Sequence, residues 1–132
     1  MDKIEFLRER FAQEGYARFL GIELEDLREG YARVRMKVTE NLHNIFATAH
    51  GGALFSLLDE AFELACNSHV EDAVAMSVTV HYVRPVTEGT VVAEAQEVAL
   101  TARTGIYDIT AYDEAGNPVA FARALCYRKR KD

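Results

Sequence analysis

The feature that most constrains this chain is the apolar stretch 52–67, which follows directly on a His-Gly-Gly sequence at residues 50–52. Its apolar side chains recur around most of a helical circumference, so the sequence predicts a central helix that is buried on several sides. One polar stripe interrupts that surface, formed by Ser56, Asp59, Glu60 and Glu63 at spacings of three and four residues. A helix this apolar must be wrapped by another large element of the same chain.

The other periodic segments alternate apolar and polar residues, which is typical of half-buried strands. Strands are expected at 22–27, 31–38, 73–83, 90–100, 105–112 and 118–128, the last four in hairpin succession. An amphipathic helix is expected at about 3–14, ended by Gly15, with Tyr16, Phe19 and Leu20 packed against the core. The sequence therefore predicts a single α+β domain over residues 1–132, with an antiparallel sheet wrapped around the central helix.

Composition limits the partners of this domain. The net charge of −6 argues against a nucleic-acid partner, and no apolar run approaches the roughly 20 residues of a membrane span. The charged start of the chain is not a signal peptide, so a cytoplasmic location is expected, with Cys66 and Cys126 as free thiols. The basic residues 128–131 are expected to form a solvated tail. Exposed sheet edges favour pairing with another copy of the chain.

Three segments resemble the hotdog-fold acyl-CoA thioesterases of the phenylacetyl-CoA thioesterase (PaaI-like) family. They are HGGALFSLLDEAFELACNS (50–68), VTVHYVRPV (78–86) and TGIYDI (104–109), within a similarity that extends from Thr39 to Arg128. The resemblance implies a hotdog fold and hydrolysis of an acyl-CoA thioester without a metal or another cofactor. It also implies a homodimer whose sheets join edge to edge, usually doubled into a homotetramer, with the active site at the dimer interface.

The resemblance further implies the site residues. Asn44 matches the asparagine of the family, and His50 and Gly51 match its His-Gly pair. Asp59 matches the catalytic acid, and Ser77 matches a serine or threonine that assists at the same site. The loop 45–47, Ile-Phe-Ala, is bulkier and more apolar than the glycine-containing loop of many relatives, and Phe46 is expected to contact the substrate.

The chemistry of thioester hydrolysis gives these residues their expected roles. The Gly51 N–H, at a helix start, can polarise the thioester carbonyl. Asp59 can act as general base on water or as nucleophile, and the sequence leaves both open. His50 is expected to fix the loop rather than to act as base, while Asn44 and Ser77 position the reacting groups. Glu60 and Glu63 are expected on a solvated stripe, or paired with arginines at a subunit contact.

Helix geometry indicates that one chain does not hold a complete site. At 1.5 Å per residue, His50 and Asp59 are roughly 13 Å apart along the helix, too far for both to touch one thioester. The sequence therefore predicts that Asn44, His50 and Gly51 of one chain meet Asp59 and Ser77 of its partner.

The sequence shows no metal-ligand spacing and no phosphate loop, so cations must hold coenzyme A. Arg84, beside Pro85, and the turn residues Arg103, Thr104 and Gly105 are the candidates. Two alternatives stay open. The chain could be a non-catalytic acyl-CoA binder or sensor, or a hotdog thioesterase for a hydroxybenzoyl- or quinone-precursor-CoA.

Overall fold

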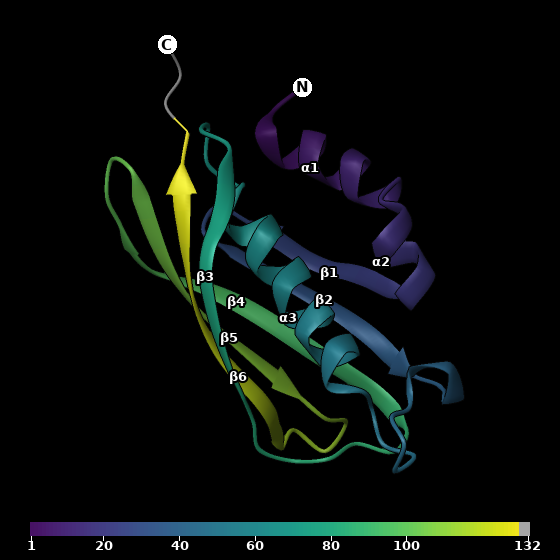
Figure 1. Cartoon of the computed structure of the whole chain (residues 1–132). Helices are drawn as coiled ribbons and strands as arrows, with labels where there is room; N and C mark the ends of the chain where they lie inside the picture. The colour runs from purple at the N-terminus through teal and green to yellow at the C-terminus, as the bar shows by residue number, and fades with distance from the viewer. Residues whose placement is uncertain (130–132) are drawn as a thin grey trace.

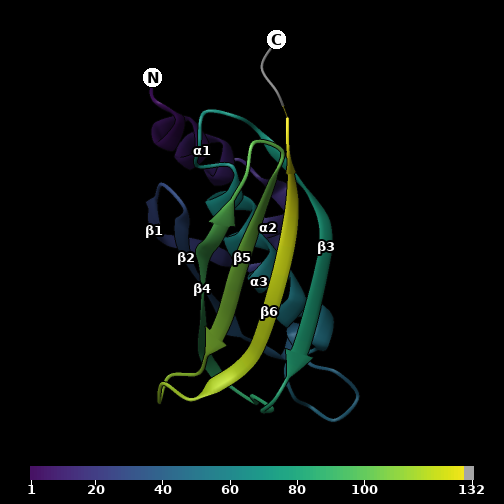
Figure 2. The ribbon, with the colours of Figure 1, turned by 90° about the vertical axis from the view of Figure 1, so that its left-hand side faces the viewer.

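A computed structural model describes residues 1–129 and shows a curved sheet with one long helix lying across its concave face (Figures 1 and 2). The elements in order are α1 (Lys3–Ala12), α2 (Gly15–Leu20), β1 (Ile22–Arg28), β2 (Tyr31–Val38), the 3-10 turn η1 (Glu40–Leu42), α3 (Gly51–Cys66), β3 (Ala73–Tyr82), β4 (Gly89–Leu100), β5 (Thr104–Tyr112) and β6 (Pro118–Arg128). The six-stranded antiparallel sheet wrapped around α3 confirms the predicted α+β architecture.

The strand order is β1-β2-β4-β5-β6-β3, which corrects the expected hairpin succession of the last four strands. Of these four strands, only β4, β5 and β6 are neighbours both in sequence and in space, because β3 pairs with β6 at the far edge. The connection 83–88 is too long for a tight hairpin and runs past the ends of β6 and β5 to reach β4 (Figure 1). The Val83 N–H donates to the Val119 carbonyl at 2.9 Å, and Val86 is buried, so the crossing is held against the sheet.

The core lies between α3 and the sheet. From α3 it takes Leu57, Leu58 and Phe62, and from the sheet it takes Val34, Met36, Val91, Tyr107, Ile109 and Cys126 among others, all fully buried. Burying each large apolar side chain contributes about 1.5–3 kcal/mol, so this layer is the main stabilising contact of the fold. Cys66 and Cys126 are both buried and not joined by a disulfide.

The N-terminal segment forms two helices, whereas the sequence predicted one helix ended by Gly15. A break at residues 13–14 separates α1 from α2, which begins at Gly15. Packing of Phe19 and Tyr16 into the core was also wrongly predicted, because both are exposed, Phe19 at 84%. Instead, the Tyr16 hydroxyl lies 2.7 Å from the Ser56 hydroxyl on α3.

The polar stripe of α3 is partly buried, which corrects its predicted solvated state. Ser56 and Glu60 are buried beside the N-terminal helices, Glu60 with only 5% of its surface exposed. The sequence could not show this burial, because the covering residues come from another segment.

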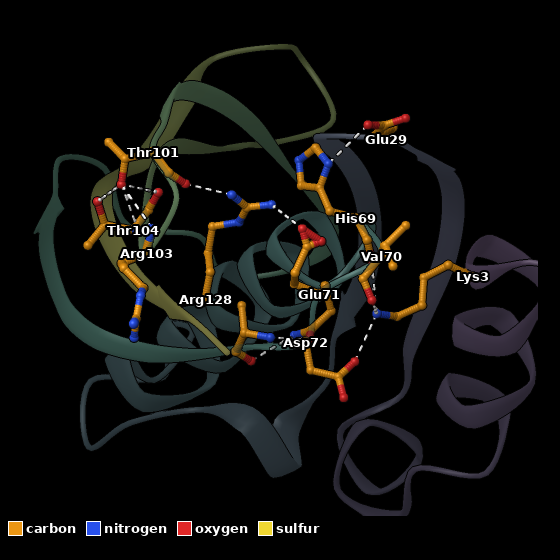
Figure 3. A network of polar contacts seen from close by, with 12 residues as sticks. Lys3, Glu29, His69, Val70, Glu71, Asp72, Thr101, Arg103, Thr104 and Arg128 are labelled. Carbon is orange, nitrogen blue, oxygen red and sulfur yellow. Dashed lines mark hydrogen bonds and ion pairs between the residues drawn. The ribbon is translucent and has the colours of Figure 1, made fainter. Parts of the chain in front are cut away.

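The end of the described chain also differs from the prediction. Arg128 is buried and donates to the Glu71 carboxylate at 3.0 Å, so it does not belong to a solvated tail (Figure 3). Residues 130 and 131 of the predicted tail lie outside the described residues. Within residues 1–129, no helix combines the length and the apolar content that crossing a bilayer requires.

Candidate active site

The start of α3 presents one free backbone donor. His50 is the N-cap residue, and its Nδ1 accepts the Gly52 N–H at 2.8 Å. The Gly51 N–H has no hydrogen-bond partner within residues 1–129, although the next three N–H groups of the helix are all bonded. This arrangement agrees with the expected part of His50 as a residue that fixes the helix start, and it leaves the Gly51 N–H at the positive end of the helix dipole.

Packing within the chain would tolerate a small side chain at position 51. A Cβ built there would lie 3.5 Å from Cζ of Tyr82, an ordinary contact, whereas a Cβ at Gly52 would lie only 3.1 Å from His50 Nδ1. Gly52 therefore makes room for the capping imidazole. Gly51 is half-buried, and because it has no side chain a ligand or a second subunit can approach its N–H closely.

Asn44 closes the loop that precedes α3. Its Oδ1 accepts the N–H groups of Phe46 and Thr48 at 2.9 and 3.2 Å, and its Nδ2 donates to Thr48 Oγ1 at 2.9 Å. At the tip of this loop Ile45 and Phe46 are 92% and 78% exposed. Within the chain, Asn44 thus shapes the loop, and Phe46 is left available to an outside group.

The base of the same loop is anchored to neighbouring segments. The His50 N–H donates to the Leu42 carbonyl and the Ala49 N–H donates to the Val86 carbonyl, both at 2.7 Å. The Tyr82 hydroxyl, at the end of β3, donates to the Gly51 carbonyl at 2.9 Å. These bonds hold the start of α3 beside the end of β3.

Asp59 is a half-buried carboxylate with no hydrogen-bond partner in the described part of the chain. It lines a hollow of about 220 Å³ together with Phe62, Glu63, Cys66, Asn67 and the first residues of β3, Ala73, Val74 and Ala75. Burial raises the pKa of the Asp59 carboxyl above its ordinary value, and the negative charge of Glu14 raises it further. A carboxylate that is poorly solvated and unpaired is suited to act as base or nucleophile.

Ser77 is not brought to Asp59 within one chain. A bulge between Ala75 and Ser77 shifts the register of β3, and Ser77 then pairs with Leu125. Because Ala124 and Cys126 are buried against α3, Leu125 and Ser77 lie on the opposite face of the sheet. Ser77 lines a hollow there with Ile106 and Arg123.

The predicted phosphate-binding residues lie at opposite ends of the sheet. Arg84 follows β3, near the start of α3, and its N–H donates to the Val119 carbonyl. Arg103, labelled in Figure 3, lies in the β4–β5 turn, near the start of β3. Its Nη1 donates to the Tyr127 hydroxyl at 2.8 Å.

The two neighbours of Arg103 are engaged within the chain. The Thr104 hydroxyl lies 2.7 Å from that of Thr101. Gly105 is buried, and a Cβ there would lie 3.0 Å from Cys126 Sγ and from a ring atom of Tyr107, so it serves close packing. Of the predicted turn, the guanidinium of Arg103 is therefore the group most open to a ligand.

One residue beside Asp59 was not predicted from the sequence. Glu14, between α1 and α2, lies against Glu60 and Glu63 of α3, with one carboxylate oxygen from each residue within 4.8 Å of the others. Burial, a hydrogen bond with Glu14 and the neighbouring negative charges raise the pKa of Glu60 to about 9. Burial and the charges of Glu14 and Asp59 raise the pKa of Glu63 to about 7. No sequence pattern links Glu14 to α3, since 46 residues separate it from Glu60.

The family of the chain follows from comparison with known proteins. The family profile described as "Thioesterase superfamily" matches residues 46–120. The acyl-coenzyme A thioesterase PaaI of Escherichia coli is 39% identical over 119 residues, which are 89% of this chain and 85% of that protein.

Solved structures agree with this assignment. The structure of the E. coli PaaI protein from the phenylacetic acid degradation operon superposes with a TM-score of 0.90 and 35% identity, covering 96% of this chain and 94% of that one. A mutant of the phenylacetic acid degradation protein PaaI from Thermus thermophilus has a TM-score of 0.85 and 36% identity, covering 88% of this chain and 100% of that one.

The antiparallel sheet wrapped around one long helix is thus a hotdog fold. The chain belongs to the thioesterase superfamily and is a thioester hydrolase, with a free N–H at the start of its long helix and an unpaired acid in the middle. Within that superfamily it is a PaaI-like acyl-CoA thioesterase.

Proposed function

We propose that the chain hydrolyses an acyl- or aryl-acyl-CoA of the phenylacetyl-CoA kind to the free acid and coenzyme A, at sites shared between two subunits. The observation that carries this proposal is the placement of two unpaired groups on one helix. The Gly51 N–H and the Asp59 carboxylate both lack partners within residues 1–129. Eight residues of continuous α-helix hold them about 12 Å apart, too far to act on one carbonyl.

Pairing of two β3 edges would bring the two groups together. In each chain the Tyr82 end of β3 lies beside Gly51, and the Ala75 end lines the hollow of Asp59. Antiparallel pairing about a two-fold axis sets the Tyr82 end of one strand beside the Ala75 end of the other. Gly51 of one subunit would then face Asp59 of its partner, which forms two identical sites.

In such a site each group has a defined part. The Gly51 N–H donates to the oxygen of the thioester carbonyl as negative charge develops on it, aided by the helix dipole. Asp59 either removes a proton from the attacking water or attacks the carbonyl carbon itself to form a transient mixed anhydride. His50 and Asn44 hold the donor and its loop in place. Ser77 has no part in this proposed site, because it lies on the face of the sheet opposite to α3.

The same pairing would gather the cations that hold coenzyme A. Arg84 follows the Tyr82 end of β3, whereas Arg103 lies near the Ala73 end of β3. Pairing the two edges sets Arg84 of one subunit on the same side as Arg103 of the partner subunit. Two guanidinium groups from different chains suit the phosphates of a bound coenzyme A.

We further propose an aromatic acyl group for the substrate, a tetrameric assembly and a cytoplasmic location. The hollow beside Asp59 and the exposed Phe46 supply an apolar lining that suits an aromatic acyl group. The E. coli relative is named an acyl-coenzyme A thioesterase, and its structure is described as a protein of the phenylacetic acid degradation operon. We include in the proposal a homotetramer made of two such dimers, and a cytoplasmic location.

The test measures free thiol released from a panel of coenzyme A esters by the whole protein. Phenylacetyl-CoA and related aryl-acyl esters should be hydrolysed with higher kcat/KM than straight-chain esters of similar size. A preference for straight chains, benzoyl-type or quinone-precursor esters would reject the proposed substrate and keep the enzyme class. Tight ester binding with no thiol release from any ester would reject hydrolysis and favour a sensor.

A further inference from the structure

The three glutamates between α2 and α3 form a compact cluster away from the start of α3. Glu14 precedes the first turn of α2, and Glu60 and Glu63 lie one turn apart on α3. One oxygen of each carboxylate lies within 4.8 Å of the other two. Glu60 is only 5% exposed, while Glu63 faces solvent, so the cluster has a buried floor and an open side.

Glu14 and Glu60 share a hydrogen bond, but each has a second carboxylate oxygen without a partner. Oε2 of Glu14 and Oε2 of Glu60 are both buried, and neither has a hydrogen-bond partner within residues 1–129. None of the ion pairs in that part of the chain involves any of the three glutamates. Arg10 and Lys129 line the same hollow as Glu14 and Glu63, but within residues 1–129 neither forms an ion pair with the three glutamates. Buried carboxylate oxygens without a partner are costly, so a further positively charged group is expected here.

We propose that Glu14, Glu60 and Glu63 bind a divalent metal ion of the oxygen-preferring class, with Ca²⁺ as the best match and Mg²⁺ or Mn²⁺ as smaller members. Three oxygens within 4.8 Å of one another surround a point that is at most about 2.8 Å from each, so a small closing movement reaches the Ca²⁺–oxygen range of about 2.3–2.6 Å. The three donors are carboxylates, which suit these ions better than zinc or copper.

The surroundings allow such an ion to enter and to be hydrated. A hollow of about 550 Å³ opens between α1 and α3, and Glu14 and Glu63 line it together with Gln13 and Asn67. Water from this hollow can complete the coordination shell, as is usual when a protein supplies only a few ligands. The bound ion would tie the start of α2 to the middle of α3.

The experiment measures ion binding directly, without reference to hydrolysis. The whole protein is treated with EDTA, dialysed, and titrated with Ca²⁺, Mg²⁺ and Mn²⁺ by calorimetry, and its thermal unfolding is followed with each ion at about 1 mM. We expect at least one ion to bind one site per chain and to raise the unfolding temperature by about 5 °C.

Two variants decide whether the cluster is the site. Glu60→Gln keeps the size of the side chain and can still hydrogen-bond to Glu14, so it should fold but lose the ion-dependent rise. Glu88→Gln, at an exposed residue before β4, should retain that rise. The matched pair separates a built site from general attraction of cations to an acidic protein.

Two results would overturn the inference. Absence of any ion-dependent rise in the unmodified protein would show that a proton shared by Glu14 and Glu60, or a cation of the partner subunit, satisfies the buried oxygens. An equal rise in Glu60→Gln would place the ion elsewhere. Either result leaves the proposed hydrolysis untouched, because neither measurement depends on activity.

Discussion

The two edges of the sheet differ in their chemistry. On β1, Glu23 and Glu25 lie opposite arginines of β2, with Glu23 paired to Arg35 and Glu25 to Arg33 at 3.4 Å. The opposite edge, β3, carries no Lys, Arg, Asp or Glu, and its Val74 and Met76 are 46% and 58% exposed. Charged edges discourage strand pairing and uncharged ones permit it, so β3 is the edge that suits the proposed pairing of two subunits.

The β3 edge also lies beside the candidate site residues of α3. The Tyr82 end of β3 holds the start of α3, and the Ala75 end closes the hollow of Asp59, whereas none of the candidate site residues lies on β1. In the proposed dimer, association and catalysis would therefore depend on one strand. A change at β3 should affect both, and a matched change at β1 should affect neither.

The largest effect is expected for Asp59→Asn. Removing a general base or nucleophile costs on the order of 10²–10⁴-fold, so kcat should fall by that factor while KM and the unfolding temperature change little. Steady-state thiol release and thermal unfolding measure the two. The matched change on the charged edge, Glu23→Gln, should leave kcat within about twofold, and an Asp59→Asn protein with full activity would remove Asp59 from the mechanism.

Mixing two inactive variants tests whether the site spans both subunits. Asp59→Asn and Gly51→Val each damage both sites of their own homodimer, but their heterodimer should contain one site with both groups intact. Random reassociation after mild denaturation should then restore about a quarter of the activity. No recovery, with heterodimers detected by mass spectrometry, would contradict a shared site.

The next effect is expected on assembly. The double change Val74→Lys and Met76→Lys puts two like charges on the uncharged edge, and it should dissociate the subunits and lower kcat/KM by more than about tenfold. Light scattering and thiol release measure these outcomes. Glu23→Lys adds a lysine to β1 and should leave the mass of the assembly unchanged. If only this control dissociated the subunits, the interface would lie at β1 and not at β3.

A smaller effect is expected for Gly51→Ala. The chain has room for the added methyl group at 3.5 Å from Tyr82, and alanine favours helices, so the unfolding temperature should not fall. The methyl group would nevertheless crowd the free N–H, and kcat/KM should drop about tenfold. Gly15→Ala is the matched control, because nothing lies within 4 Å of a Cβ there; equal activity of the two variants would count against the oxyanion role.

The smallest effect is expected on β1 itself. Arg35→Ala removes an exposed pair with Glu23 at 3.4 Å, and such pairs contribute less than about 1 kcal/mol. Urea unfolding should show a loss of that size or less, with unchanged kcat. A large loss of stability would mean that the charged edge supports the fold as well as limiting its pairing.

Local patterns sufficed for most elements of the fold. The apolar run at 52–67 predicted α3 to within a residue at each end, because its period and its His-Gly-Gly start are both local signals. The strands were predicted equally well from their alternation. The position of β3 was wrong, since a crossover and a hairpin have the same local pattern, and only packing decides which strand is the neighbour.

The surroundings of the polar α3 residues were harder to predict from the sequence than the helix itself, because they depend on segments that are distant in the chain. Asp59 and Gly51 were proposed as site residues through a family resemblance, and the structure adds that both groups lack hydrogen-bond partners within the described chain. Glu60 was assigned to a solvated stripe, but residues of the N-terminal helices bury it. The helical periodicity of one segment cannot predict that a different segment buries its polar residues.

The sequence by itself thus determined the α+β class, the long buried helix and the thioesterase family, and it led to the proposal of Asp59 as the acid and Gly51 as the backbone donor. Those properties depend on residue types at short spacing, which the chain carries wherever it folds. Only the tertiary structure decided which edge is left uncharged and unpaired, and that Glu14 joins Glu60 and Glu63. These depend on contacts between distant segments, whose choice is made by packing of the whole core rather than by any local preference.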